Sequence, residues 1–236
     1  MKQAFFISTL ALAISSSAFA SLPTIENGEN GKAEAKLGLT VKINAPVCTF
    51  DLNGGQTVDF GLTSPNRLSE TTSTRLTQHA ATLDVMCPAP VLITMSLQDT
   101  HMNALTNASQ NALFPGRELA QQFALVDKKK PDALIGSYVM VMTDINNNES
   151  SKTHYDMHDV ETNAYWDHYF RSSKSNSDRS VATAKFTSVD GAVQHIKNLR
   201  LEFNVIPEIL PSSKISVGEG APIDFVGETT FKMVYM

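Results

Sequence analysis

The chain has little cysteine, tryptophan and positive charge, and it has no long apolar run after its first 20 residues. Two cysteines and one tryptophan occur in 236 residues, and 24 acidic residues outnumber 19 basic ones. The resulting formal charge of −5 argues against a nucleic-acid partner, which would need a basic surface. No later stretch approaches the roughly 20 apolar residues of a membrane-spanning helix. We therefore expect no nucleic-acid partner and no membrane span.

The sequence also lacks the motifs of common enzymes. It has no G-x-S-x-G, no C-x-x-C spacing, and no cysteine paired with a histidine in a recognisable catalytic context. Its many serines stand in turn-like clusters rather than beside a general base. We expect no enzyme activity and no cofactor.

The first 20 residues have the features of a secretory signal peptide. Lys2 gives a positive start, Ala4 to Ile14 is mostly apolar, and Ala18-Phe19-Ala20 is a small-x-small cleavage site before Ser21. Cleavage would remove one basic and no acidic residue, which changes the formal charge from −5 to −6. We expect an exported protein that begins at Ser21.

Both cysteines, Cys48 and Cys87, lie in the exported part. In an oxidising compartment an even pair predicts one disulfide. Closing a loop of this length should stabilise the fold by about 4 kcal/mol on the chain-entropy model. A redox or metal role is the alternative, but neither cysteine has a second obvious ligand beside it.

Alternation of apolar and polar residues is the main pattern of the mature chain, and it predicts strands. Helical periodicity is weak, apart from a short turn near 118–123, and the polar region 143–180 is typical of long loops. The charged segment 128–132 predicts an exposed hairpin loop. Many short strands with turn signals between them predict an all-β fold, an antiparallel β-sandwich. We expect strands at 33–43, 57–62, 80–86, 91–97, 123–126, 138–143 and 199–205.

The last six residues alternate up to the end of the chain. Phe231, Met233 and Tyr235 would lie on one side of an extended strand, with Lys232 on the other. Chain ends usually fray, because ordering them costs backbone entropy. A patterned terminal strand therefore predicts that this end is held, either by the rest of the sheet or by a partner that binds a C-terminal strand.

Several of these features together resemble a pilin-type subunit of a chaperone–usher fimbria. They are the signal peptide, the segment Pro46–Phe50 around the first cysteine, Val58–Gly61, a second cysteine at the end of a strand, and a penultimate Tyr235. The resemblance covers nearly all of the mature chain. It is nearest to a larger group of fimbrial-like proteins of poorly known role.

The resemblance implies an immunoglobulin-like sandwich that lacks its last strand. Such a subunit has an apolar groove and an unpaired sheet edge. A periplasmic chaperone lends a strand to this groove, and the N-terminal extension of a neighbouring subunit then replaces it at an outer-membrane usher. The partners implied are therefore the chaperone, the usher and neighbouring fimbrial subunits. The location implied is the periplasm in transit and then the cell-surface fimbrium.

In this scheme the sequence offers one donor-strand candidate near its mature N-terminus. The apolar residues of this candidate alternate along the segment 33–39. The alternative is that 33–43 is simply one long first strand. On the donor-strand hypothesis the chain divides into a signal peptide (1–20), an N-terminal extension (21–36) and a pilin-like β-sandwich domain (37–236). The donor-strand candidates are Ala33, Ala35, Leu37 and Leu39.

Two polar regions could carry a ligand site. His154 and His158 would share a face of a helix and could bind zinc, with a third ligand from the neighbouring loop. The other interpretation is a solvated aromatic and acidic loop, and loop aromatics of this kind contact sugars or proteins. We favour the second interpretation, with Tyr165, Trp166 and Tyr169 as candidate ligand contacts.

The segment Asp144–Asn148 places oxygen atoms at alternate positions, as a calcium loop does. It lacks the turn glycine, and Tyr155 stands where the bidentate glutamate of such a loop would be. An asparagine-rich turn is favoured, and we expect no metal site.

Three functions are consistent with these patterns. The first is a structural or tip-proximal subunit of a surface fimbria that contributes to cell adhesion. The second is a fimbrial-type adhesin that binds a surface ligand through its loops. The third is a free periplasmic sandwich that binds a ligand or a metal.

Overall fold

The computed structural model describes residues 34–43, 48–53, 57–62, 67–107, 117–149, 152–172, 182–215 and 224–236, which belong to one compact unit. Besides strands, these residues form a helix, α1 (Met102–Asn107), and two 3-10 helices, η3 (Leu119–Gln121) and η4 (Ser212–Lys214). No helix in the described ranges is long and apolar enough to cross a membrane. The strands are β1 (Glu34–Ile43), β2 (Thr49–Asn53), β3 (Thr57–Leu62), β4 (Thr74–Arg75), β5 (His79–Val91), β6 (Ile93–Asp99), β7 (Phe123–Asp127), β8 (Lys130–Asn146), β9 (Asp156–Asp159), β10 (Thr183–Thr187), β11 (Ile196–Ile209) and β12 (Phe225–Tyr235).

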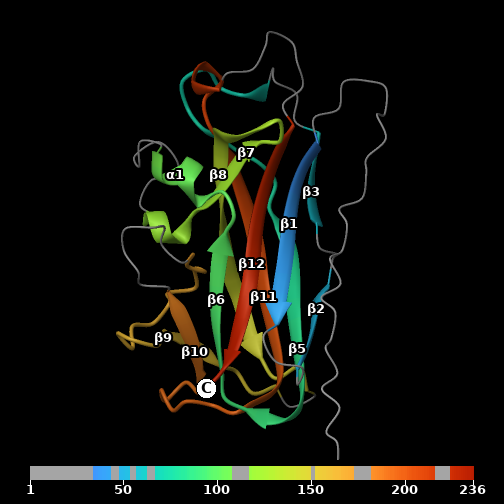
Figure 1. Ribbon diagram of the computed structural model, residues 1–236, viewed down its shortest axis with the longest axis vertical. Helices are drawn as coiled ribbons and strands as arrows, with labels where there is room; N and C mark the ends of the chain where they lie inside the picture. The colour runs from blue at the N-terminus through green and yellow to red at the C-terminus, as the bar shows by residue number, and fades with distance from the viewer. Residues whose placement is uncertain are drawn as a thin grey trace, which may run out of the picture. The chain divides into compact units, whose positions relative to one another are not determined.

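These strands form one continuous sheet that folds into two facing layers. The hydrogen-bonded order is β2-β5-β11-β8-β7-β12-β6-β10-β9; β4 pairs with β11, and β1 pairs with both β12 and β3. The long strand β12 pairs with β7 at Phe225 and Val226, and with β6 from Thr229 onward. One layer therefore contains β5, β11 and β8, and the other contains β1, β12, β6 and β10. Figure 1 shows β12 and β6 in front of β11.

A cluster of three buried phenylalanines joins the two layers. Phe203 lies on β11, Phe231 on β12, and Phe170 follows β9; each is at most 1% exposed. The ring centroid of Phe170 lies 5.2 Å from that of Phe203 and 5.8 Å from that of Phe231, both edge to face. Burying each such side chain contributes about 1.5–3 kcal/mol. The cluster thus holds β12 against the opposite layer.

The alternating pattern that predicts a strand at 199–205 is confirmed. Leu199, Leu201, Phe203 and Val205 on β11 are all at most 1% exposed, and the residues between them are half-buried. This is the pattern of a strand with one face in the core. β11 is flanked by β5 and β8, so it lies in the interior of its layer.

The prediction of an all-β sandwich is confirmed. The hairpin expected at 128–132 forms between β7 and β8, with Lys128 and Lys129 in the turn; residues 130–132, expected in the loop, are the exposed start of β8. The short turn expected near 118–123 contains η3. α1 was not predicted, because six residues are too few to show a helical period. Within the region expected to be loops, β9 forms a short strand. The predicted signal peptide (1–20) and residues 21–33 of the predicted extension lie outside the described residues.

The predicted disulfide is confirmed. Cys48 and Cys87 are bonded, and both are at most 5% exposed. Cys48 directly precedes β2 and Cys87 lies in β5, so the bond joins two neighbouring strands of one layer. It therefore fixes the start of β2 to the sheet.

Substitution of Gly136 should test the packing between β8 and β11. An alanine Cβ there would lie 2.2 Å from the backbone oxygen of Glu208, which cannot move without distorting β11. We expect Gly136→Ala to lower the free energy of unfolding by about 1–3 kcal/mol or more, measured by urea denaturation. Gly191→Ala is the comparison, because space is open around Gly191 and only its positive φ of 87° opposes a side chain. Equal unfolding midpoints for Gly136→Ala and the unmodified protein would contradict this account.

Candidate functional site

The end of the chain is held by the sheet itself. The Met236 amide donates to the Leu92 carbonyl at 3.0 Å. The Tyr235 hydroxyl accepts a 2.9 Å hydrogen bond from the Cys48 amide. These bonds tie the last two residues to the corner between β5 and β6 and to the start of β2. The sequence left two alternatives for what holds the terminal strand: the rest of the sheet, or a partner that binds it. In the described residues, the rest of the sheet holds it.

The predicted orientation of the terminal strand is confirmed. Phe231 and Met233 are at most 3% exposed, Tyr235 is half-buried, and Lys232 is exposed. Their inward face packs into the phenylalanine cluster. The outward face ends in Val234, which is 41% exposed. β12 is therefore a core strand up to the end of the chain.

The second edge of β12 is covered by β1, the first described strand. β1 pairs with β12 in parallel from Ala35, opposite Phe225, to Ile43, opposite Met233. Its other edge pairs in antiparallel with β3. Figure 1 shows β1 and β12 side by side with their arrowheads pointing the same way, and β6 running in the opposite direction. We call the position between β12 and β3 the strand slot.

The donor-strand candidates thus stand in the strand slot of their own chain. Ala35, Leu37 and Leu39 are the Cα partners of Phe225, Gly227 and Thr229. Ala33 lies outside the described residues. The segment is one unbroken strand, as the alternative hypothesis held, but it belongs to the layer of β12, whereas β2 pairs with β5. No sequence signal identified β12 as its partner.

Gly227 gives β12 the space it needs beside the core. A Cβ at this position would lie 2.6 Å from Cε1 of Tyr138 and 2.9 Å from Cδ2 of Leu125. It would also lie 3.0 Å from the Ala124 carbonyl oxygen. Tyr138, Leu125 and the Ala124 carbonyl therefore fill the core side of β12 at Gly227, the Cα partner of Leu37.

A buried polar group lies on the other edge of β12, across that strand from the slot, and was not predicted. Asp99, at the end of β6, is 5% exposed and is the Cα partner of Thr229. Its two carboxylate oxygens accept hydrogen bonds from the amides of Ala124, at 2.7 Å, and His101, at 2.9 Å. Desolvation raises the pKa of Asp99 from 3.8 to about 7, and the carboxylate of Glu228 adds to the rise, while the two amides oppose it.

The nearby tyrosine and threonine complete this buried group. The Tyr138 and Thr229 hydroxyls are 2.5 Å apart, and both residues are fully buried. Burial raises the pKa of Tyr138 well above 10, and the Asp99 carboxylate acts in the same direction. A hydrogen-bonded hydroxyl pair avoids the cost of an unpaired polar group in the core. The pair therefore fixes β8 against β12.

The predicted ligand loop contains one exposed tyrosine. Tyr165 is 42% exposed, whereas Trp166 is 1% exposed and packs in the core, so Trp166 is not available to a surface ligand. Tyr169 is half-buried, and the Arg117 guanidinium lies 4.0 Å from its ring centroid. The Tyr165 ring centroid lies 5.6 Å from that of His158 and 5.7 Å from that of His168.

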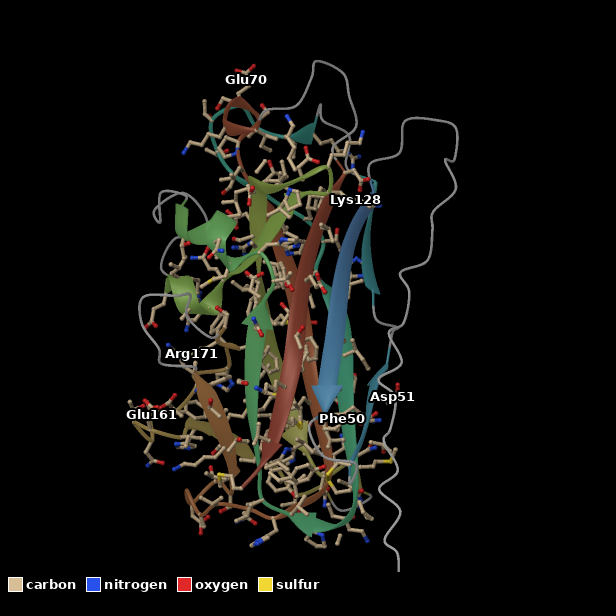
Figure 2. The ribbon with its side chains drawn as sticks, in the orientation of Figure 1. Phe50, Asp51, Glu70, Lys128, Glu161 and Arg171 are labelled. Carbon is tan, nitrogen blue, oxygen red and sulfur yellow. A yellow bond between two sulfur atoms is a disulfide. The ribbon has the colours of Figure 1, made fainter. Side chains whose placement is uncertain are left out.

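The backbone of this loop is tightly held. Asn163, Asp167 and His168 have positive φ angles of 57°, 41° and 61°, which non-glycine residues rarely adopt. The Trp166 amide donates to the Met157 carbonyl at 3.0 Å, which attaches the loop to β9. Figure 2 shows Glu161 and Arg171 on the side of β9 and β10, and Phe50 and Asp51 on the opposite side of the view, by β2. In the order of strands, β6 and β10 lie between β9 and β12.

The two histidines considered for zinc do not lie on a helix. His154 Nδ1 is 2.9 Å from Asp144 Oδ1, and His158 Nδ1 is 3.1 Å from the Asn163 carbonyl oxygen. Burial raises the pKa of Asp144, but hydrogen bonds from Asn146 and His154 outweigh it and lower the pKa overall. Within the described ranges, no group of three or more His, Cys, Asp or Glu residues is arranged to hold a metal ion.

The asparagine-rich segment forms a turn. The Asn146 side-chain oxygen accepts a 2.8 Å hydrogen bond from the Asn148 amide, and Asn148 has a φ of 53°. Asparagine adopts such angles more readily than most residues, because its side chain can bond to the nearby backbone. This turn joins β8 to the segment before β9.

The Asp99 environment predicts a pH dependence of stability. The folded protein retains the Asp99 proton up to about pH 7, whereas the unfolded chain releases it near 3.8. The contribution of Asp99 to the free energy of unfolding should therefore fall as pH rises from about 4 to about 7, with a slope of at most about 1.4 kcal/mol per unit. Urea denaturation at several pH values measures it, with Asp99→Asn as the non-titrating control. Identical pH profiles for the two proteins would show that this carboxyl does not titrate in that range.

Comparison with known families and proteins gives one match. Residues 37–120 match a family described as "Protein of unknown function (DUF1120)". The matched range begins within β1, includes both cysteines and ends in η3. No curated protein matches this chain. The chain is thus similar, from β1 through α1, to a family whose description assigns no activity.

Proposed function

We propose that this chain is a structural or tip-proximal subunit of a surface fimbria. It is exported through the periplasm, meets a periplasmic chaperone and an outer-membrane usher, and joins neighbouring subunits by strand exchange. The observation that carries this proposal is the strand slot. β12, the last strand, needs a strand along its second edge, and a segment from the opposite end of the chain occupies that edge.

Three further features support strand exchange at this slot. A strand in the slot pairs along both of its edges. An incoming strand would therefore gain main-chain hydrogen bonds to β12 and to β3. The face of β12 that points to the core is apolar and buried from Phe225 to Met233, apart from the hydroxyl pair at Thr229. The segment that fills the slot has the alternating pattern of residues 33–43. An unfilled slot would leave the second edge of β12 unpaired, which is a hazard for aggregation.

A truncation of the chain end tests this proposal. Removal of Val234–Met236 deletes the hydrogen bonds that the Met236 amide donates to the Leu92 carbonyl and that the Cys48 amide donates to the Tyr235 hydroxyl. We expect the truncated protein to lose co-purification with its cognate periplasmic chaperone and to be degraded, because the chaperone would no longer align its strand with β12. Val193→Ser is the control, since it changes an exposed apolar side chain outside β12.

The result that excludes a fimbrial subunit is also clear. A self-sufficient sandwich would lose only a few kcal/mol on this truncation and would persist alone. Stable, monomeric full-length protein that needs no chaperone would overturn the proposal.

One observation favours adhesion through a loop as a second function. Tyr165 is an exposed aromatic side chain on a loop whose backbone is fixed by the buried Trp166 and Phe170. An aromatic ring presented on a rigid loop loses little conformational entropy when it contacts a ligand. Tyr165 and the neighbouring His158 and His168 are the residues we propose for this contact.

Replacement of Tyr165 tests the second function. Tyr165→Ala should reduce the adherence of cells that display the protein, and it should change the free energy of unfolding by no more than about 0.5 kcal/mol. Trp166→Ala is the contrasting variant, and it should cost about 3–5 kcal/mol of stability. Unchanged adherence of cells that display Tyr165→Ala at normal levels would remove this loop from the function.

A further inference from the structure

An outward-facing row of side chains crosses β9. Tyr165 forms an antiparallel bridge with His158 on β9, and His158 is the Cα partner of Lys185 on β10. Residues paired in this way point to the same face of a sheet. The neighbouring residue of each segment points to the other face, and all three neighbours are at most 1% exposed: Met157, Trp166 and Phe186. Tyr165, which is 42% exposed, therefore stands on the outer face of a sheet edge whose inner face packs in the core.

Three carboxylates lie on or beside this outer face. Desolvation raises the pKa of Tyr165, and the nearby carboxylates of Asp156 and Asp167 raise it further. Glu161 lies in the turn that follows β9 and is exposed. We call Asp156, Glu161, Tyr165 and Asp167 the acidic surface. Lys185, in the outward row, supplies one positive charge against these three negative ones. An exposed aromatic ring with carboxylates beside it binds ammonium groups, through cation–π contact and charge-assisted hydrogen bonds. The acidic surface therefore fits a partner that carries lysine side chains.

Such side chains occur on the same chain, in the turn between β7 and β8. Lys128, Lys129 and Lys130, which we call the lysine turn, are the only three consecutive basic residues in the sequence, and all three are exposed. Asp127 pairs with Lys130, and the Asp127 carboxylate accepts a 2.8 Å hydrogen bond from the Lys129 amide. The Lys128 amide donates to the Asp224 carbonyl at 3.0 Å, and the Lys128 ammonium lies 3.7 Å from the Asp224 carboxylate. These contacts fix the turn and leave Lys129 and Lys130 to project from it.

The lysine turn and the acidic surface lie at opposite ends of β12. Asp127, next to the lysine turn, pairs with Phe225. Lys185, in the outward row, pairs with Thr94 on β6, and Thr94 pairs with Val234. Nine steps along an extended strand separate Phe225 from Val234, which is about 30 Å. Figure 2 shows the lysine turn near the top of the view and the acidic surface at the lower left, with one residue of each labelled. The lysine turn can therefore reach an acidic surface only on another copy of the chain.

We propose that the lysine turn of one copy binds the acidic surface of a second copy. In this contact the ammonium groups of Lys129 and Lys130 lie against the carboxylates of Glu161 and Asp167, beside the ring of Tyr165. Because the two surfaces differ, the contact is head to tail and leaves one of each uncovered. The contact goes beyond strand exchange at the slot, and each can hold without the other. The end copy keeps its acidic surface open, so Tyr165 there remains available for the second function.

Charge reversal on either side tests the contact. The turn variant carries Lys129→Glu and Lys130→Glu, and the surface variant carries Asp156→Lys and Glu161→Lys. Each variant places like charges opposite one another, so we expect it to lower the association constant of the mature protein at least about tenfold, measured by analytical ultracentrifugation at low salt. Glu70→Lys is the control, because Glu70 is exposed and belongs to neither surface. Equal association of the unmodified protein and either reversed variant would overturn the proposal.

A mixture of the two variants identifies the contact itself. A reversed turn fits a reversed surface, so the mixture should associate as the unmodified protein does, although each variant alone does not. Urea denaturation checks that both variants fold, and Glu161→Lys alone, on an exposed turn, repeats the measurement if Asp156→Lys lowers the unfolding midpoint. A folded mixture that stays dissociated would refute the contact. Association that neither variant nor about 1 M salt weakens would belong to strand exchange, and it would overturn the contact while the proposed function stands.

Discussion

The structure depends on the pairing of both edges of the last strand. β12 joins the two layers through Phe231, and its backbone needs partners on each side. β6 and β7 pair with one edge of β12. β1, which comes from the opposite end of the sequence, pairs with the other edge. β1 therefore decides whether the second edge of β12 is paired or left open.

The held chain end and the disulfide cooperate in this arrangement. Cys48 is bonded to Cys87 in one layer, and its amide donates to Tyr235 in the other layer. The same residue therefore fixes the start of β2 and the end of β12. It also limits how far the end of β1, five residues earlier in the chain, can move while the fold stays intact. The disulfide in one layer thus holds the residue whose amide donates to the end of β12 in the other.

The sequence predicts the strands better than their partners. Alternation in residues 199–205 and in the last six residues is a local signal, and both strands form as predicted. The pairing of β1 with β12 joins residues about 190 positions apart, and no local pattern encodes such a pairing. Whether the side chain of a loop residue is buried also depends on contacts with residues far away in the sequence. Trp166 has the sequence context of a surface aromatic, yet the loop turns its side chain into the core, and Asp99 shows no sign in the sequence of its burial.

The proposed strand exchange requires β1 to leave β12 and β3 while the rest of the sheet stays folded. Amide hydrogen exchange of the full mature protein measures this most directly. We expect the β1 amides to exchange through local opening, faster than those of β11 by several orders of magnitude, while the β11 amides exchange only on global unfolding. Equal protection of β1 and β11 would contradict a displaceable strand in the slot.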